Sequence, residues 1–401
     1  MGLASGRITY SRFRVAGKVE ADTADQLLQV LFEHRFQAVT LPTASEAEVG
    51  FVTGEHAEDV DFTVASCVFG AGYNLVRAAI RIDTHTPPPH LVKALRMKHT
   101  TAAAKGNPSG FASRAQKADA KDLASREIAD QVASGRFRKT KVIDLLWDLR
   151  EGIFYFGSHA ATAQDQLNRL MRSAFGVHLT WLTSGTLAGE ASTDAGRRGA
   201  LEDVAPTEFT RPPADDEERN PPIPWLAKAH DLKDFLGSEF ILFWLHCLEG
   251  KSDVLPFTNA DGEELYLAFL NVFDLACAWG RTGKAQLRGE LPHRLPEARK
   301  ALQLGKWPRK AGMVLAESDR QWEFVLTLDD LGISGLRLPD VEEAETPRDL
   351  LAARLELLVE FDRLLRLLYA AFVKLRVESA WAKEVKAIGA WITRDQKAGA
   401  R

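Results

Sequence analysis

The first 86 residues carry short apolar runs typical of strands, with one helical pattern between them. Large apolar residues from Ile8 to Val15 predict a first strand, and Thr23 is placed to cap the helix that follows. Further strands are predicted over 49–53, 62–69 and 74–83. In the last of them Arg77 and Arg81 lie opposite the apolar face, so we expect both on the outer face of a sheet.

A long polar segment, residues 87–138, interrupts the strand pattern. Three consecutive prolines end the preceding strand and predict a helix over 90–99, because proline is tolerated in a first helical turn. Gly, Asn and Pro within 100–110 end that helix, and a second helix is predicted over 112–133. The second helix is polar on nearly every side, so we expect it to project from the body as a finger.

The apolar pattern returns after the finger. A hairpin is predicted over 139–149 and 153–156, followed by a helix that Ser158 caps and Gly176 ends, and then by a closing strand. We therefore expect the segments on either side of the finger, 1–86 and 139–190, to form one N-terminal α+β domain.

The rest of the chain begins with an acidic, proline-rich stretch. Residues 191–224 predict a linker or insertion, in which the carboxylates of Asp215–Glu218 are solvated rather than a metal site. A second α+β domain is predicted over 225–345, with a short helix between Pro296 and Gly305 and a hairpin over 310–316 and 321–328. From 346 to 401 the leucines recur at helical spacing, which predicts one long helix that Thr346 caps and that packs against a domain or another subunit.

Together these patterns predict a mixed, multi-domain α+β fold with antiparallel sheets, a projecting basic helical finger and a long C-terminal helix. The composition, 45% hydrophobic and 26% charged, is ordinary for a globular protein with a core. No apolar run is long enough to cross a bilayer, and the N-terminus lacks the apolar segment of a signal peptide, so we expect a cytoplasmic protein. Three cysteines among apolar neighbours predict reduced core residues rather than disulfides or zinc ligands.

Positive charge is concentrated in and around the finger. The whole chain has a formal net charge of -4, yet residues 91–147 contain twelve Lys and Arg against five Asp and Glu. A local positive field on an acidic protein is a candidate binding surface. Arg114, Lys117 and Lys121 follow one another at helical spacing and so lie near one face of the second finger helix.

The linear sequence contains no motif that predicts catalysis or a metal site. Residues 280–285 have the wrong spacing for a phosphate-binding P-loop and lack its hydroxyl, and 70–75 lie between two strands rather than opening a helix. HExxH, CxxC and GxSxG patterns are absent from the sequence. We therefore predict no catalytic residue, no metal ligand and no cofactor.

With catalytic and metal motifs absent, the most informative feature is a set of cationic side chains next to an aromatic one. This combination favours nucleic-acid binding. Lys and Arg neutralise phosphates and release counterions, which dominates nonspecific DNA binding. Phe137 lies between two arginines at the expected finger tip, where it could wedge between base steps or stack on an unpaired base. The alternative is that the basic helix is a solvated face and Phe137 a core anchor. The candidate DNA-contacting residues are Arg77, Arg81, Lys93, Arg96, Arg114, Lys117, Lys121, Arg136, Phe137, Arg138, Lys139 and Lys141.

These residues and their order resemble the family of the recombination-associated protein RdgC. The resemblance covers most of the chain and is strongest in Asn74-Leu75-Val76, Pro87-x-Pro89-x-Leu91, the polar basic helix, Arg136-Phe137, Leu145-Leu146-Trp147-Asp148 and the helix over 160–175. It returns in Leu304-Gly305-Lys306, in Gln321-Trp322-Glu323-Phe324 and in 331–339. Residues 100–110 and 192–224 resemble insertions, and the C-terminal helix extends beyond the usual end.

The resemblance implies a homodimer closed into a ring, with double-stranded DNA passing through a positively charged hole. It also implies DNA binding without sequence preference, association with the nucleoid, and restraint of RecA-driven strand exchange, with no enzymatic activity and no cofactor. By position, Arg114 resembles a hole-lining arginine and Phe137 the aromatic residue of the finger tip. A further DNA-facing site of the family falls on Arg288 and Arg294, with His293 beside them.

Two other function classes stay open from the residues alone. The leucine-rich C-terminal helix could bind a protein partner, with the basic finger serving only solubility. A nuclease would require carboxylates that the fold brings together in a pocket.

Overall fold

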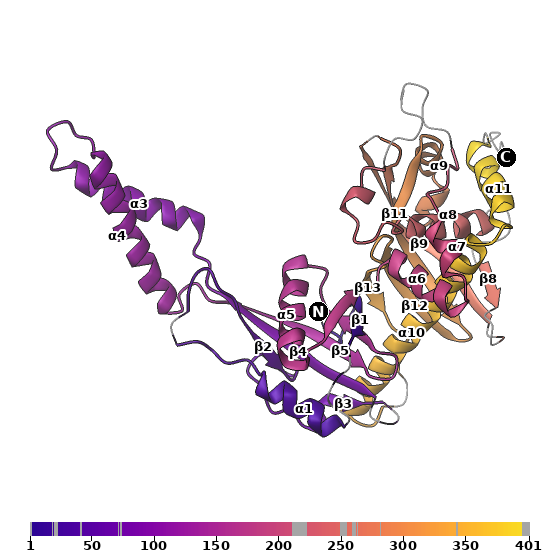
Figure 1. The fold of residues 1–401 in the computed structure, drawn as a ribbon, viewed down its shortest axis with the longest axis horizontal. Helices are drawn as coiled ribbons and strands as arrows, with labels where there is room; N and C mark the ends of the chain where they lie inside the picture. Colours follow the sequence, from indigo (N-terminus) through magenta and orange to yellow (C-terminus); the bar gives the residue numbers. More distant parts are fainter. Residues whose placement is uncertain are drawn as a thin grey trace.

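The computed structural model describes residues 2–394 except 18, 20–22, 41, 71, 73, 211–222, 249–254, 259–261, 263, 281 and 342–343. Figure 1 shows three parts: a first half at the bottom, a two-helix finger that rises from it on one side, and a second half on the other side. Helices and a large antiparallel sheet are both present, with a long helix near the C-terminus, which confirms the predicted α+β class.

One antiparallel sheet runs through both halves. Its strands in the first half are β1 (Ile8–Ala16), β2 (Glu48–Val52), β3 (Val68–Phe69), β4 (Leu75–Thr84), β5 (Lys139–Asp148), β6 (Ile153–Phe156) and β7 (His178–Trp181). Those in the second half are β8 (Leu255–Thr258), β9 (Glu264–Cys277), β10 (Lys284–Gly289), β11 (Lys306–Glu317), β12 (Arg320–Thr327) and β13 (Ile333–Arg337). The order is β10-β9-β11-β12-β13-β1-β6-β5-β4-β2, while β3, β7 and β8 pair with β4, β1 and β9.

Strand β1 joins the two halves. Its first residues, Ile8 and Tyr10, pair with β13, and its later residues pair with β6 and β7. The two α+β domains predicted from the sequence are therefore parts of one continuous sheet. The hairpin of β11 and β12 and the strand over β4 agree with the prediction.

Helices α1 (Ala24–Glu33) and α5 (Ala161–Phe175) cover the first half of the sheet. Their apolar faces, which include Leu28, Leu167 and Met171, share a buried core with strand residues. Thr23 forms the predicted N-cap of α1, and Gly176 ends α5 in a left-handed conformation. The predicted cap Ser158 is wrong, because the N-cap of α5 is Ala160, which forms no side-chain cap. The strand predicted over 62–69 is wrong in its first part. Thr63 and Ser66 form a capping box there, which starts the short helix α2 (Val64–Cys67) before β3.

The second half contains further helices: α6 (Ser184–Asp194), α7 (Arg198–Glu202), α8 (Leu236–Leu248) and α9 (Pro296–Gln303). Of these, α8 and α9 pack on β11. The prediction of a linker over 191–224 is corrected for its described residues, because Leu201, Phe209 and Ile223 are buried in the core. The acidic cluster Asp215–Glu218 lies outside the described residues. Helix α9 agrees with the predicted helix between Pro296 and Gly305.

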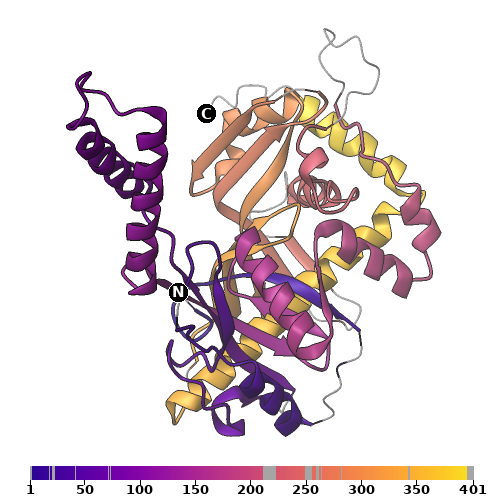
Figure 2. The same ribbon diagram turned by 60° about the vertical axis from the view of Figure 1, so that its left-hand side comes forward.

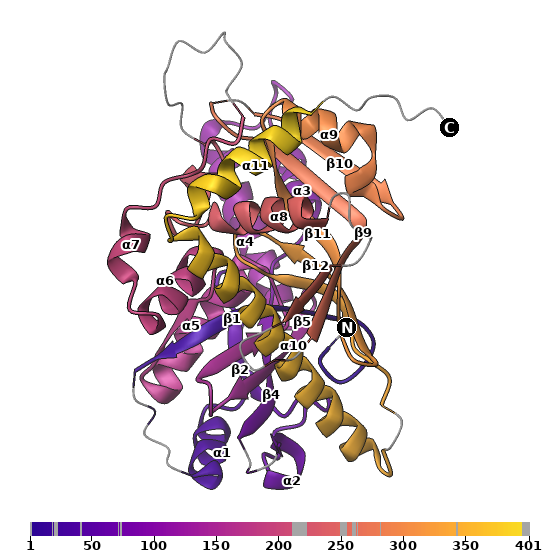
Figure 3. The ribbon, with the colours of Figure 1, turned by 90° about the vertical axis from the view of Figure 1, so that its right-hand side faces the viewer.

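The C-terminal part contains two helices where one was predicted. Thr346 caps α10 (Pro347–Arg376) in a capping box with Asp349, and α11 (Trp381–Thr393) follows after a short turn. In Figure 3 α10 runs diagonally along the molecule and α11 continues across its upper end. The apolar stripe of α10, including Leu358, Phe361 and Leu365, is buried in the core of this same chain.

A buried ion pair ties α10 to the first half. Arg12 Nη1 lies 2.7 Å from Oδ1 of Asp362, and both side chains are almost fully buried. Tyr10 and Tyr155 donate to the two carboxylate oxygens of Asp362, and Arg366 donates to Oδ2. Arg12, Tyr10 and Tyr155 lie on β1 and β6, so this network connects α10 to the strands of the first half.

Candidate nucleic-acid interface

The finger is a pair of antiparallel helices, α3 (Pro89–Ala104) and α4 (Arg114–Ala133), that extend away from the sheet (Figures 1 and 2). The prediction that this segment projects is confirmed, although α3 continues to Ala104 instead of ending at residue 99. Leu95 of α3 and the small residues Ala120 and Ala124 of α4 are buried between the helices. Small side chains allow close contact between the helices, so α3 and α4 pack together without a large core of their own.

Polar contacts also connect the two finger helices. His99 Nε2 lies 3.0 Å from Oε2 of Glu127, and Lys98 lies 3.6 Å from Oε1. The hydrogen bond from His99 and the charge of Lys98 lower the pKa of Glu127, so this carboxylate stays ionised and holds α3 against α4.

One side of α4 carries the cations that the sequence placed together. Arg114, Lys117 and Lys121 are all exposed. Their spacing of three and four residues puts them on one face, while Asp119 and Asp122 project from other sides of the helix. No carboxylate in the described part of the chain forms an ion pair with any of the three. On α3, Lys93 and Arg96 are exposed as well.

The predicted position of Phe137 is wrong. Residues 134–138 follow α4 and lead directly into β5, so Phe137 is half-buried at the base of the finger and not at its tip. The guanidinium of Arg136 lies 6.0 Å from the ring centroid of Phe137. Lys139 and Lys141 are exposed on the first residues of β5, opposite Thr84 and Ile82 of β4.

Arg138 has a structural partner at this base. Its Nε lies 3.1 Å from Oδ2 of Asp83, a fully buried carboxylate that also accepts two hydrogen bonds from Arg81. Burial acts to raise the pKa of Asp83, but the hydrogen bonds from Arg81 and Thr140 outweigh it and lower the pKa. Arg138 therefore anchors the finger to β4 as well as adding charge.

The tip of the finger is the loop over 105–113, which the sequence analysis treated only as a helix break. Its Phe111 is 79% exposed. The loop is held by Asn107, whose side chain donates to the carbonyl of Phe111 at 2.7 Å and to Oε1 of Gln116 at 2.6 Å. Gln116 also closes the capping box of Ser113 at the start of α4. A phenylalanine in a loop of Gly, Asn, Pro and Ser between two polar helices was the signal that could have found it.

Arg77 and Arg81 need correction, because both are 2% exposed and do not lie on a solvated face. The loop after β2 covers that face of β4. Arg77 donates to Glu55 and to the carbonyl of Gly54, and Arg81 donates to Glu58, to Asp83 and to the carbonyl of Ala57. Both guanidinium groups are buried and ion-paired inside the protein, so they are not available to a phosphate.

Arg288 and Arg294 lie far from the finger within one chain. Arg288 is on β10, at the opposite end of the sheet from β4, and forms an ion pair with Asp274. Arg294 is exposed in the short 3-10 turn Pro292–Arg294. The structure thus groups the finger cations along the finger and at its base. Arg288 and Arg294 are not part of this group.

Three further findings concern metal binding, membrane-spanning helices and similarity to known proteins. Among the described residues, no group of three or more His, Cys, Asp and Glu side chains is arranged to bind a metal ion. None of the helices in the described ranges combines the length and apolar character required to cross a membrane. The chain matches no model of a protein family and no curated protein with which it was compared.

Proposed function

We propose that this protein binds double-stranded DNA without reading its sequence, with the finger as the main contact. The observation that supports this most directly is the exposed row of Arg114, Lys117 and Lys121 on a segment that stands away from the core. Long cationic side chains without an acidic partner can neutralise phosphates and release counterions. Phosphate contacts of this kind set position and carry no sequence information.

In this proposal Phe111 takes the role that the sequence analysis gave to Phe137. It is the exposed aromatic residue at the finger tip, and its loop is held in place by the Asn107 and Gln116 side chains. A preorganised aromatic ring beside phosphate-binding cations can stack on a base or insert between base steps. Phe137 then serves to anchor the base of the finger.

We further propose that two copies close around the duplex. The finger and the second half extend from the first half in different directions, so that one chain has the shape of an open clasp (Figures 1 and 2). A second copy related by a two-fold axis could complete the enclosure. The resemblance to the RdgC family supports this arrangement, and with it a nucleoid-associated homodimer that restrains RecA-driven strand exchange by occupying DNA, without catalysis or a cofactor.

The rival proposal, a scaffold that binds a protein partner through the leucine-rich C-terminal helix, has less support. The leucines on which it depends, Leu358, Leu364 and Leu368 among them, are 0% exposed in the core of this chain. A partner could reach them only after α10 left the core, which would expose a large apolar surface.

The decisive experiment measures binding of a random-sequence duplex by fluorescence anisotropy over a range of salt concentrations. We expect the double substitution Lys117→Gln/Lys121→Gln to weaken binding of every duplex sequence by about tenfold or more at low salt. The slope of log affinity against log salt should fall by about 0.9 for each phosphate contact removed. Lys383→Gln/Lys386→Gln is the matched control, since these two exposed lysines lie on α11, across the molecule from the finger.

Enclosure is tested with the same protein on closed circular and linear plasmid. A closed dimer should resist a salt challenge on circular DNA and dissociate after the plasmid is cut, because it can then slide off the end. Binding that is insensitive to salt, or equal losses in the finger and control variants, would contradict the proposal.

A further inference from the structure

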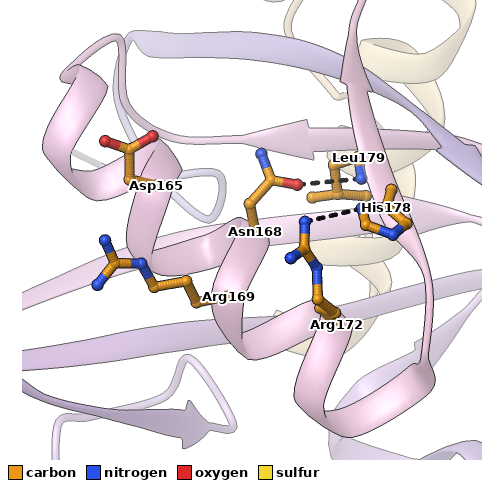
Figure 4. A pocket seen from close by; sticks show the side chains of 6 residues that line it. All are labelled: Asp165, Asn168, Arg169, Arg172, His178 and Leu179. Atoms are coloured by element: carbon orange, nitrogen blue, oxygen red, sulfur yellow. Dashed lines mark hydrogen bonds between the residues drawn. The ribbon is translucent and has the colours of Figure 1, made fainter.

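A cavity of about 460 Å³ lies between α5 and the start of β7, outside the finger (Figure 4). Its lining side chains are Asp165, Asn168, Arg169, Arg172, His178 and Leu179. Helix α5 buries Leu167 and Met171 against the sheet, so the opposite face, with Arg169 and Arg172, stays in solvent. Gly176 then reverses the chain and brings His178 back beside Arg172.

After the hydrogen bonds inside this pocket are formed, most of the polar groups that remain available to a ligand are hydrogen-bond donors. Arg172 Nη2 lies 3.0 Å from Nδ1 of His178, and because a guanidinium can only donate, we assign Nδ1 as the acceptor and place the ring proton on Nε2. Asn168 Oδ1 accepts from the backbone N–H of Leu179 at 3.0 Å, which leaves the amide NH₂ of Asn168 free to donate.

Arg169 is the second cation of the pocket. It forms no ion pair with a carboxylate in the described ranges, and Figure 4 shows its side chain extending away from Arg172 and His178, on the side of the pocket where Asp165 lies. Asp165, four residues before it, is the one carboxylate of the lining. Two guanidinium groups, an imidazole N–H and an amide NH₂ around one cavity suit an anion with several oxygens, and guanidinium pairs match a phosphate in particular.

The position of α5 in the molecule indicates the source of a phosphate that this pocket could bind. In Figures 1 and 2 the helix stands on the first half, between the direction of the finger and that of the second half. A duplex held by the finger of an open clasp would pass over this region. We propose that the α5–β7 pocket binds a backbone phosphate of the same duplex, as a second contact that fixes the duplex against the body. This inference rests on the proposed function.

The test compares three variants of the full chain with the wild type on a random duplex. Arg169→Gln/Arg172→Gln should weaken binding by about three- to tenfold and lower the salt slope by about 0.9. Asp165→Asn, which removes the only carboxylate of the pocket, should strengthen binding. Lys383→Gln/Lys386→Gln should leave both quantities unchanged. Chemical denaturation of each variant shows whether it is folded.

The possible outcomes separate this inference from the proposed function. If the wild type binds no duplex, both are wrong. If the finger variant loses binding while the pocket variants match the wild type, only the inference is overturned. Arg172 also lies in the last turn of α5, where a cation stabilises the helix dipole. A role limited to that would appear as lower stability with unchanged affinity, and would overturn the inference too.

Titration with inorganic pyrophosphate, followed by calorimetry, distinguishes the source of the phosphate. Binding of pyrophosphate that depends on Arg169 and Arg172, together with unchanged duplex affinity in the double variant, would assign the pocket to a free anion and refute the DNA contact. Loss of duplex affinity with the predicted change in salt slope would support it.

Discussion

The finger helix α4 and the C-terminal helix α10 are both long and both begin with a capping box, yet they have opposite fates. Buried residues of α10 recur on every turn from Leu355 to Arg376, and the helix lies in the core. On α4 only Ala120, Ala124 and Val132 are buried. The capping signal therefore starts a helix in both places, and the width of the apolar face decides whether that helix holds the fold together or leaves it and becomes available to a ligand.

The largest expected effect tests the structural side of this comparison. Phe361 of α10 is 0% exposed, and its ring centroid lies 4.7 Å from that of Phe324. We expect Phe361→Ala to lower the free energy of unfolding by about 3–5 kcal/mol, because a large cavity forms where the core cannot collapse. Urea denaturation measures it. The matched change on the finger, Leu123→Ala at a 51% exposed site, should cost less than about 1 kcal/mol; equal losses would contradict the contrast.

The next effect concerns the base of the finger, where the projecting helices join the sheet. The lowered pKa of Asp83 means that its ion pairs stabilise the folded state above the unfolded pKa of about 3.9, and that this contribution is lost as pH falls through the lower, folded pKa. Asp83→Asn should therefore reduce stability by about 3 kcal/mol near neutral pH, since it leaves Arg81 buried without its main partner.

The pH dependence sharpens that prediction. The stability difference between wild type and Asp83→Asn should shrink as the pH falls below the unfolded pKa of about 3.9, because the wild type then loses the same interaction. Denaturation curves at several pH values measure it. Asp119→Asn, an exposed change on α4, serves as the control and should differ from the wild type by less than about 0.5 kcal/mol. A difference for Asp83→Asn that stays constant with pH would rule out the assignment.

The smallest effect compares the two capping boxes directly. Removing the cap hydroxyl in Thr346→Ala or Ser113→Ala should cost each helix about 1 kcal/mol. For Thr346→Ala the loss should appear in global denaturation, because α10 unfolds with the core. For Ser113→Ala it should appear mainly as faster hydrogen exchange at the first amides of α4, since the finger can fray while the sheet stays folded. Global destabilisation of equal size in both would show that the finger is coupled to the core.

Much of the fold could be predicted from local patterns. The projecting finger, the β11–β12 hairpin and the cap at Thr346 follow from periodicity and capping chemistry, which act within a few residues. The grouping of Arg114, Lys117 and Lys121 on one face follows from helical spacing alone. These features need no knowledge of the rest of the molecule.

Other features depended on tertiary contacts, such as which segment covers a given face of a strand. Alternation correctly put Arg77 and Arg81 on the second face of β4, but only the folded chain shows that the loop carrying Gly54, Glu55 and Glu58 buries that face. The sequence pattern does not show whether the turn before α4 or the turn after it forms the end of the projection, and the prediction for Phe137 depended on that choice. The actual tip is the loop between the two helices, where Phe111 is exposed.

The sequence by itself determined where several helices begin, which cations share a face, and that residues 91–147 carry an excess of positive charge, because each of these can be read along the backbone. The tertiary structure alone decided that one sheet unites both halves, that α10 packs in its own core, and that an open pocket lined by Arg169, Arg172 and His178 lies between α5 and β7. These depend on contacts between residues far apart in the chain, and the pattern of any one segment does not specify its partner.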